Sequence, residues 1–211
     1  MTEYPIDLAI TIFSGFTQKS GDVANVGMVG LEDVVEALCE DLPTVRVRRY
    51  LWDANVEDIV ENIWQHRRNG HQKHLIVGYS YGGDRAVKMC WALNRRNDVE
   101  VLELCLCDGV RRWKWLPGVA AATGLGRLVI PPVVRHVWWY RQHNPRWSLR
   151  RGLDMFNPAG HNVVAANPER TVVSQPVVVS ETHSYIDNSG SFRMKFLESV
   201  KSALEIQGVT K

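Results

Sequence analysis

The serine of the segment Gly78-Tyr79-Ser80-Tyr81-Gly82 is the residue best placed to do chemistry. It follows the apolar run 74–77 and precedes residues 84–96, which have the pattern of a helix. A serine between a strand and a helix, with a glycine two positions away on each side, is typical of a nucleophile elbow. The turn is so tight that side chains at the glycine positions would collide. The alternative is a glycine-rich turn whose serine only caps the helix.

A serine hydroxyl attacks well only when a base takes its proton, and a carboxylate usually orients that base. Such groups collect at the carboxyl ends of the strands in a parallel sheet. Asp108 ends an apolar run, and His183 follows the last expected strand. We therefore expect His183 to accept the proton of Ser80 and Asp108 to orient His183. Asp154, which lies beyond a long basic stretch, is the alternative acid.

An oxyanion hole needs two backbone N–H groups aimed at the oxygen on which negative charge develops. One should come from Tyr81, the residue after the serine. The other should come from Phe16, because Ser14-Gly15-Phe16 follows the first expected strand. The alternative for this short segment is a simple glycine turn.

The sequence has no spacing typical of a metal site, and we expect neither a metal nor a cofactor. The four cysteines do not pair as Cys-x-x-Cys, and buried free thiols indicate a reducing, cytoplasmic compartment. The first residues carry acids where a secretory signal would carry bases, and no apolar run approaches the roughly 20 residues that span a membrane.

Strands that alternate with helices must position these residues. At 211 residues, with 45% hydrophobic and 23% charged residues, the chain has the composition of one globular domain. The alternation predicts an α/β fold with a mostly parallel sheet and helices on both faces. Asp53 or Asn55 should cap the second helix, Asp187 should cap the last, and Pro176 interrupts the last strand. The expected strands are 8–13, 44–50, 74–79, 99–107 and 172–179, and the expected helices are 29–41, 56–69, 84–96 and 192–204.

Residues 110–165 look like an irregular insertion that forms a cap or lid. Between Gly109 and Leu153 there are nine basic residues, five of the eight tryptophans and no acid. The remainder of the chain holds 16 basic residues against 23 acids. The stretch could meet a lipid surface, bind an anionic substrate, or pack as a cap whose arginines pair with the acidic remainder. Nucleic acid is not expected, because no recognised binding motif is present.

Because this insertion follows Asp108, we expect it to cover the active site. Trp138 and Trp139 should wall an apolar acyl pocket. Arg111 and Arg112 should lie at its rim and attract anionic substrates.

The succession of a strand, Ser14-Gly15-Phe16, the elbow at Ser80, Asp108 and then His183 resembles the α/β-hydrolase superfamily, whose triad follows this chain order. The resemblance covers roughly residues 6–110 and 170–207. It implies a compact α/β-hydrolase-like fold, with 1–211 as one domain that carries the cap insertion.

The same resemblance implies a serine hydrolase that cleaves a small-molecule ester or thioester through an acyl-enzyme on Ser80. The chain departs from the usual pattern because it is short, so that the first two antiparallel strands are missing. Its acid follows the strand next after the elbow strand, where many members place it one strand later, and Ser14 stands where lipases often have histidine. The alternative is a non-catalytic binding or structural protein on the same scaffold.

Overall fold

The computed structural model describes residues 7–15, 28–42, 44–66, 72–109, 127–142, 163–181 and 186–206. Strands and helices alternate along the first half of the chain, and shorter strands follow. In chain order the elements are β1 (Leu8–Phe13), α1 (Met28–Cys39), β2 (Val45–Tyr50), α2 (Val56–Gln65), β3 (Gln72–Tyr79), α3 (Tyr81–Leu93), β4 (Val99–Cys107), β5 (Leu128–Ile130), β6 (Val134–Gln142), β7 (Val163–Ala165), β8 (Val172–Val173), β9 (Val177–Val179), the 3-10 helix η2 (Ile186–Asn188) and α5 (Gly190–Ile206).

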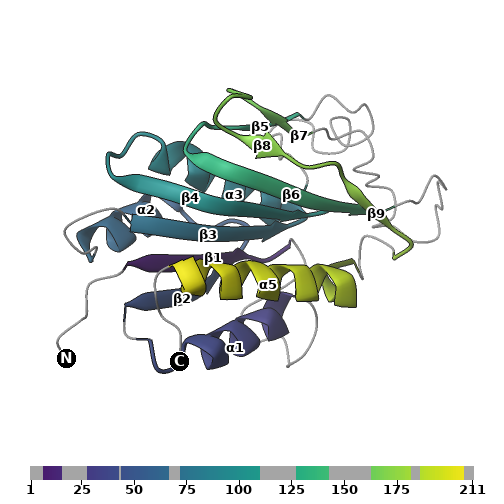
Figure 1. Ribbon diagram of the computed structural model, residues 1–211, viewed down its shortest axis with the longest axis horizontal. Coiled ribbons are helices and arrows are strands. Elements are labelled where there is room, and N and C mark those ends of the chain that lie inside the picture. The colour runs from purple at the N-terminus through teal and green to yellow at the C-terminus, as the bar shows by residue number, and fades with distance from the viewer. Residues whose placement is uncertain are drawn as a thin grey trace.

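The central sheet has the strand order β2-β1-β3-β4-β6-β8, and β9 also pairs with β6. Every pairing in it is parallel. Helices α1 and α5 lie on one side of the sheet, and α2 and α3 lie on the other (Figure 1). The order reverses between β1 and β3, and ligands of such sheets bind outside the carboxyl ends of the strands at this reversal. The predicted α/β fold with a mostly parallel sheet is thus confirmed.

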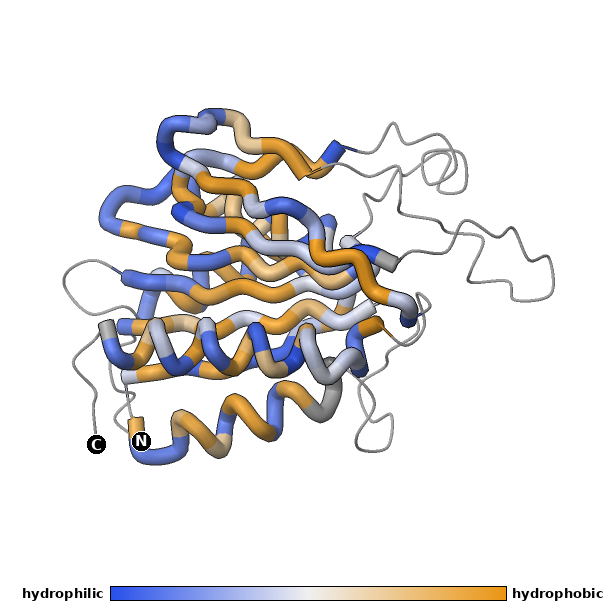
Figure 2. Tube along the Cα trace, turned by 45° about the vertical axis from the view of Figure 1, so that its right-hand side comes forward, coloured by the Kyte–Doolittle hydropathy of each residue, from blue (hydrophilic) through white to orange (hydrophobic). Residues whose placement is uncertain are grey.

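Two hydrophobic clusters, one on each face, bury β1 completely and most residues of β3 and β4. In β1 the side chains of Ala9 and Phe13 join the cluster under α2 and α3, whereas Leu8, Ile10 and Ile12 join the cluster under α1 and α5. Figure 2 shows the strands as largely hydrophobic and the helices as alternating between hydrophobic and hydrophilic residues. A strand buried on both faces appears in the sequence as a continuous apolar run, which is why β1 could be predicted.

The start of α2 and the end of the sheet follow the local chemistry of the chain. Asn55 caps α2, because its side-chain oxygen accepts a hydrogen bond of 3.1 Å from the backbone N–H of Glu57. Pro176 separates β8 from β9, which pair with different parts of β6. Proline has no N–H to donate, so the edge of the sheet is interrupted where the sequence predicts.

The expected irregular insertion 110–165 differs from the structure at residues 134–142. These residues form β6, a strand of the central sheet between β4 and the edge segments β8 and β9. Residues 128–130 and 163–165 pair as β5 and β7 in a small second sheet. Residues 110–126 and 143–162 of the expected cap lie outside the described residues.

His74 makes the stability of this core dependent on pH. Its ring is fully buried in β3, and Nε2 lies 3.2 Å from the side-chain oxygen of Gln72. Burial lowers the pKa of His74 from 6.5 to about 3. The unfolded chain therefore takes up a proton below pH 6.5, whereas the folded protein does not until about pH 3. The contribution of His74 to stability is complete above pH 6.5 and is lost as the pH falls.

We expect the free energy of unfolding to fall by about 2 kcal/mol through His74 when the pH is lowered from 7 to 5. In His74→Gln, urea unfolding should show a correspondingly smaller loss between these two pH values. His66→Gln is the control, because His66 is only partly buried at the end of α2. If the free energy of unfolding changes with pH in the same way in the wild type and in His74→Gln, His74 is not the source of the pH dependence.

Candidate active site

Ser80 stands between β3 and α3 in a conformation that serine rarely adopts. Its φ is 53° and its ψ is −124°, in the positive-φ region that favours glycine. Holding a non-glycine residue there costs about 1–3 kcal/mol, and such residues gather at functional sites. The Ser80 hydroxyl makes no capping hydrogen bond to α3. The alternative in which this serine only caps the helix is therefore wrong.

The glycines on either side of Ser80 are required by close approaches between main chains. A Cβ atom on Gly78 would lie 2.5 Å from the carbonyl oxygen of Gly82. A Cβ atom on Gly82 would lie 2.5 Å from the carbonyl oxygen of Phe13 and 2.6 Å from that of Ser14. The first turn of α3 is thus pressed against the end of β1, and no side chain fits at either position.

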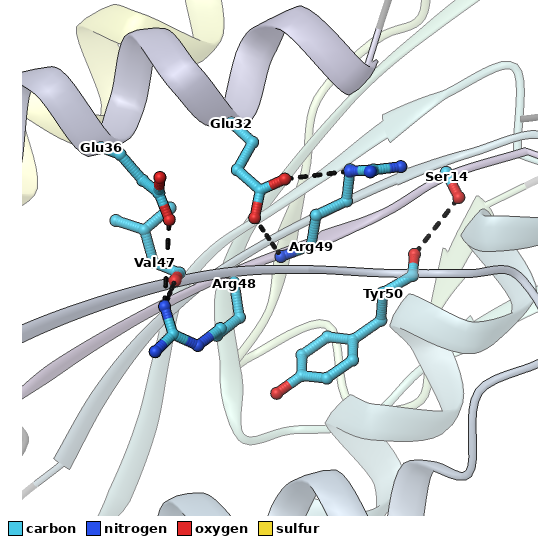
Figure 3. Close-up of polar contacts among 7 residues, drawn as sticks. All are labelled: Ser14, Glu32, Glu36, Val47, Arg48, Arg49 and Tyr50. Carbon is cyan, nitrogen blue, oxygen red and sulfur yellow. Dashed lines mark hydrogen bonds and ion pairs between the residues drawn. The ribbon is translucent and has the colours of Figure 1, made fainter. Parts of the chain in front are cut away.

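The loop that follows β1 is held against β2 and reaches Ser80. The backbone N–H of Ser14 donates to the carbonyl of Tyr50 at 3.0 Å, and its hydroxyl donates to the same oxygen at 3.3 Å (Figure 3). A Cβ atom on Gly15 would lie 3.3 Å from the Cβ of Ser80 and 2.6 Å from the ring of Tyr79. Gly15 therefore lies directly beside Ser80.

A buried charge pair ties the strand that carries Tyr50 to the helix above it. The carboxylate of Glu32 on α1 accepts hydrogen bonds from the backbone N–H of Arg49 at 3.0 Å and from its Nε at 2.9 Å (Figure 3). Both side chains are largely buried, with an exposed fraction of 14% for Arg49 and 21% for Glu32. Two charge-assisted bonds to one carboxylate fix the end of β2 more firmly than a solvated ion pair would.

The two N–H groups expected to form the oxyanion hole are only partly described. Tyr81 is the first residue of α3, and the first N–H groups of a helix have no acceptor within it. Phe16 lies outside the described residues, although its neighbour Gly15 lies beside Ser80.

Asp108 lies next to the elbow, at the end of the neighbouring strand β4. The backbone N–H of Ser80 donates to the carbonyl of Cys107 at 3.1 Å, and that of Asp108 donates to Tyr140 at 2.8 Å. The Asp108 side chain is buried, and its φ of 48° is again in the positive-φ region. The structure therefore brings Ser80 and Asp108 to adjacent strand ends, as the sequence predicts.

Four other residues singled out by the sequence cannot be placed. They lie outside the described residues and are the expected base His183, the alternative acid Asp154, and the rim residues Arg111 and Arg112.

Sequence reasoning missed the surroundings of Asp187, which it assigned only as a helix cap. The side chain is buried in η2, immediately before α5. Burial raises the pKa of the Tyr79 hydroxyl and of the Cys107 thiol, and the charges of Asp187 and Asp108 raise both further. Two buried carboxylates thus act on the same two side chains. The only signal in the sequence was the position of Asp187 four residues after His183.

The Cys107 thiol is poorly suited to act as a nucleophile. Its pKa is raised well above the usual value by burial first and by nearby carboxylates second, so the thiol stays protonated near pH 7. All four cysteines are free and buried.

Trp138 and Trp139 belong to the core and do not wall a pocket, because they point to opposite faces of β6. The Trp138 ring packs on Phe192 under α5 with ring centroids 5.6 Å apart, and its N–H donates to Glu103 at 2.7 Å. Trp139 joins the other cluster and donates to the carbonyl of Ser174 at 3.0 Å. Consecutive residues of a strand face opposite sides of the sheet. Their expected role in substrate choice is therefore not supported.

The described part of the chain was also compared with the requirements of a metal site and of a membrane-spanning helix. Within it, no group of three histidine, cysteine, aspartate or glutamate residues is arranged to hold a metal ion. None of its helices combines the length and the apolar character that crossing a membrane requires.

We expect Gly82→Ala to destabilise the fold by about 1–3 kcal/mol, because its methyl group meets two main-chain carbonyl oxygens that cannot yield cheaply. Thermal unfolding measures this loss. Gly190→Ala is the control, since a Cβ atom there meets nothing within 4 Å. If Gly82→Ala unfolds like Gly190→Ala, the close contact between α3 and β1 is wrong.

No protein-family model and no curated protein sequence matches the chain. Among solved structures it is similar to the RedJ thioesterase of the prodiginine biosynthetic pathway in Streptomyces coelicolor, with 10% identity and a TM-score of 0.48 over 95% of this chain and 89% of that one. It is also similar to the NocB thioesterase domain from the nocardicin cluster, with 13% identity and a TM-score of 0.44 over 94% and 95% of the two chains. A third, from Pectobacterium atrosepticum and described as a YdeN-like hydrolase, has 13% identity and a TM-score of 0.40 over 92% and 90%. Two of these three similar structures are described as thioesterases, and the third is described as a hydrolase.

Proposed function

We propose that the protein is a serine hydrolase that cleaves a small-molecule ester or thioester. The observation that carries the proposal is the backbone of Ser80, whose positive φ is maintained between two positions that only glycine can fill. A folded protein keeps such strain only where the surroundings enforce it, and here they present the serine at the carboxyl edge of the sheet.

In the proposed reaction, Oγ of Ser80 attacks the acyl carbon while His183 takes the serine proton. The N–H groups of Tyr81 and Phe16 stabilise the oxyanion, and His183 then returns the proton to the leaving alcohol or thiol. Water, activated by His183, hydrolyses the acyl-enzyme and restores Ser80. Asp108 orients His183, because it lies at the strand end beside the elbow.

The cap is proposed to consist of residues 110–126 and 143–162, since residues 134–142 of the expected insertion form β6. Arg111 and Arg112 are proposed to attract anionic substrates or a lipid surface, and the buried free thiols suit a cytoplasmic location.

A non-catalytic protein on the same scaffold is the competing function, and labelling with a fluorophosphonate separates the two. Labelling at Ser80 supports the hydrolase, and no labelling at any concentration supports the binding protein.

We expect Ser80→Ala to lower the turnover of a p-nitrophenyl ester by orders of magnitude, because the nucleophile is lost. Ser80→Gly should be equally inactive, yet more stable than the wild type by about 1 kcal/mol, because glycine adopts positive φ without strain. Turnover and urea unfolding measure the two effects. Ser202→Ala, on the exposed side of α5, is the control for both. Normal turnover in Ser80→Ala would remove Ser80 from the mechanism.

We expect Asp108→Asn to lower turnover by about 10⁴-fold, as the loss of an orienting carboxylate does in other triads. Asp154→Asn should have a much smaller effect. The kcat of both variants should be compared after circular dichroism has shown that each is folded. The reverse ranking would assign the acid to the segment outside the described residues.

A further inference from the structure

The structure contains a concave site at the edge of the sheet opposite to Ser80. A cavity of about 1030 Å³ lies between the starts of β3, β4 and β6 and the turn before β8. Figure 2 shows hydrophilic turns at this edge. Lys73, in the cavity wall, and Ser80 lie near opposite ends of β3. At about 3.3 Å per residue they are roughly 23 Å apart, so this cavity is not the proposed acyl site.

The charge lining the cavity is predominantly positive. Arg135 pairs with Glu100, and Arg96 pairs with Glu61 at 2.7 Å. Lys73 and Arg170 have no ion pair with any residue that the structure describes, and the remaining acid is Asp98. The basic residues in the lining are Lys73, Arg96, Arg135 and Arg170, and the acidic ones are Asp98 and Glu100.

Hydrogen bonds hold the walls in place. The side-chain oxygen of Asn94, at the end of α3, accepts the backbone N–H of Val133 at 3.1 Å. The carbonyl of Val133 in turn accepts the N–H of Val101 in β4 at 3.0 Å. Next to Arg170, the buried hydroxyl of Thr171 donates to the carbonyl of Val134 at 2.8 Å. The cavity is thus formed before any ligand arrives, which reduces the entropy cost of binding.

We propose that this cavity binds a phosphorylated small molecule of nucleotide size. Its volume is at the upper end of the range of small-molecule sites. Lys73 and Arg170 supply charges that form no ion pair within the described part of the chain, and a guanidinium group matches two phosphate oxygens at once. Val99, Pro132 and Val133 form an apolar wall on which a planar ring can lie.

The proposal is tested with ADP, pyrophosphate and adenosine as probes, by isothermal titration calorimetry on the whole protein at low salt. ADP should bind more tightly than pyrophosphate, and adenosine should not bind measurably. Lys73→Gln and Arg170→Gln should each weaken ADP binding about tenfold or more, because each removes a charge-assisted contact. Added salt should weaken it as well.

Lys201→Gln is the matched control, because Lys201 is an exposed cation on α5, away from the cavity. Turnover of a p-nitrophenyl ester should be unchanged in Lys73→Gln and Arg170→Gln, so failure of the cavity and failure of the proposed hydrolase are distinguishable. The absence of ADP binding at millimolar concentration, or equal binding by the wild type and both variants, would overturn the proposal. Equal affinity for pyrophosphate and ADP would overturn the role of the apolar wall.

Discussion

The contact between the first turn of α3 and the end of β1 is the constraint on which the rest of the site depends. Gly82 lies so close to the carbonyl oxygens of Phe13 and Ser14 that a single methyl group would strike both. The chain turns sharply at Ser80 immediately before this contact, and that serine has a φ of 53°. The contact also brings Gly15 beside Ser80, so one contact positions both the proposed nucleophile and the loop expected to stabilise its oxyanion.

The sheet then determines which other groups can reach this point. β1 and β3 are neighbours on either side of the order reversal, and in open parallel sheets ligands bind outside the carboxyl ends of the strands at such a reversal. The next strand, β4, delivers Asp108 to the same edge, and a hydrogen bond from Ser80 to Cys107 fixes their spacing. Opposite faces of the sheet are covered by separate helix pairs, so neither helical layer blocks the edge.

The sequence predicted these elements where local signals agreed. The buried strand β1 is a continuous apolar run, and the glycines on either side of Ser80 stand where main chains approach closely. It failed at β6, where Arg135, His136 and Arg141 interrupt the apolar residues and Trp138 and Trp139 face opposite sides. A strand buried on both faces lacks the alternation of polar and apolar residues that marks a half-buried strand. The basic residues of β6 were therefore assigned to the basic cap insertion. The burial of Asp187 depends on packing between η2 and distant strands, and no local pattern reports such contacts.

Residues with positive φ lie at both edges of the sheet. Among the described residues, three that are not glycine have positive φ, and these are Ser80, Asp98 and Asp108. Aspartate tolerates this region more readily than serine, so Ser80 is the most informative of the three. Ser80 and Asp108 lie together at the carboxyl edge, whereas Asp98 lines the basic cavity at the amino edge, where its carbonyl accepts the N–H of Gln72 at 2.9 Å. Strained residues persist where surrounding structure holds them, and such a residue lies in the proposed active site and another in the lining of the cavity.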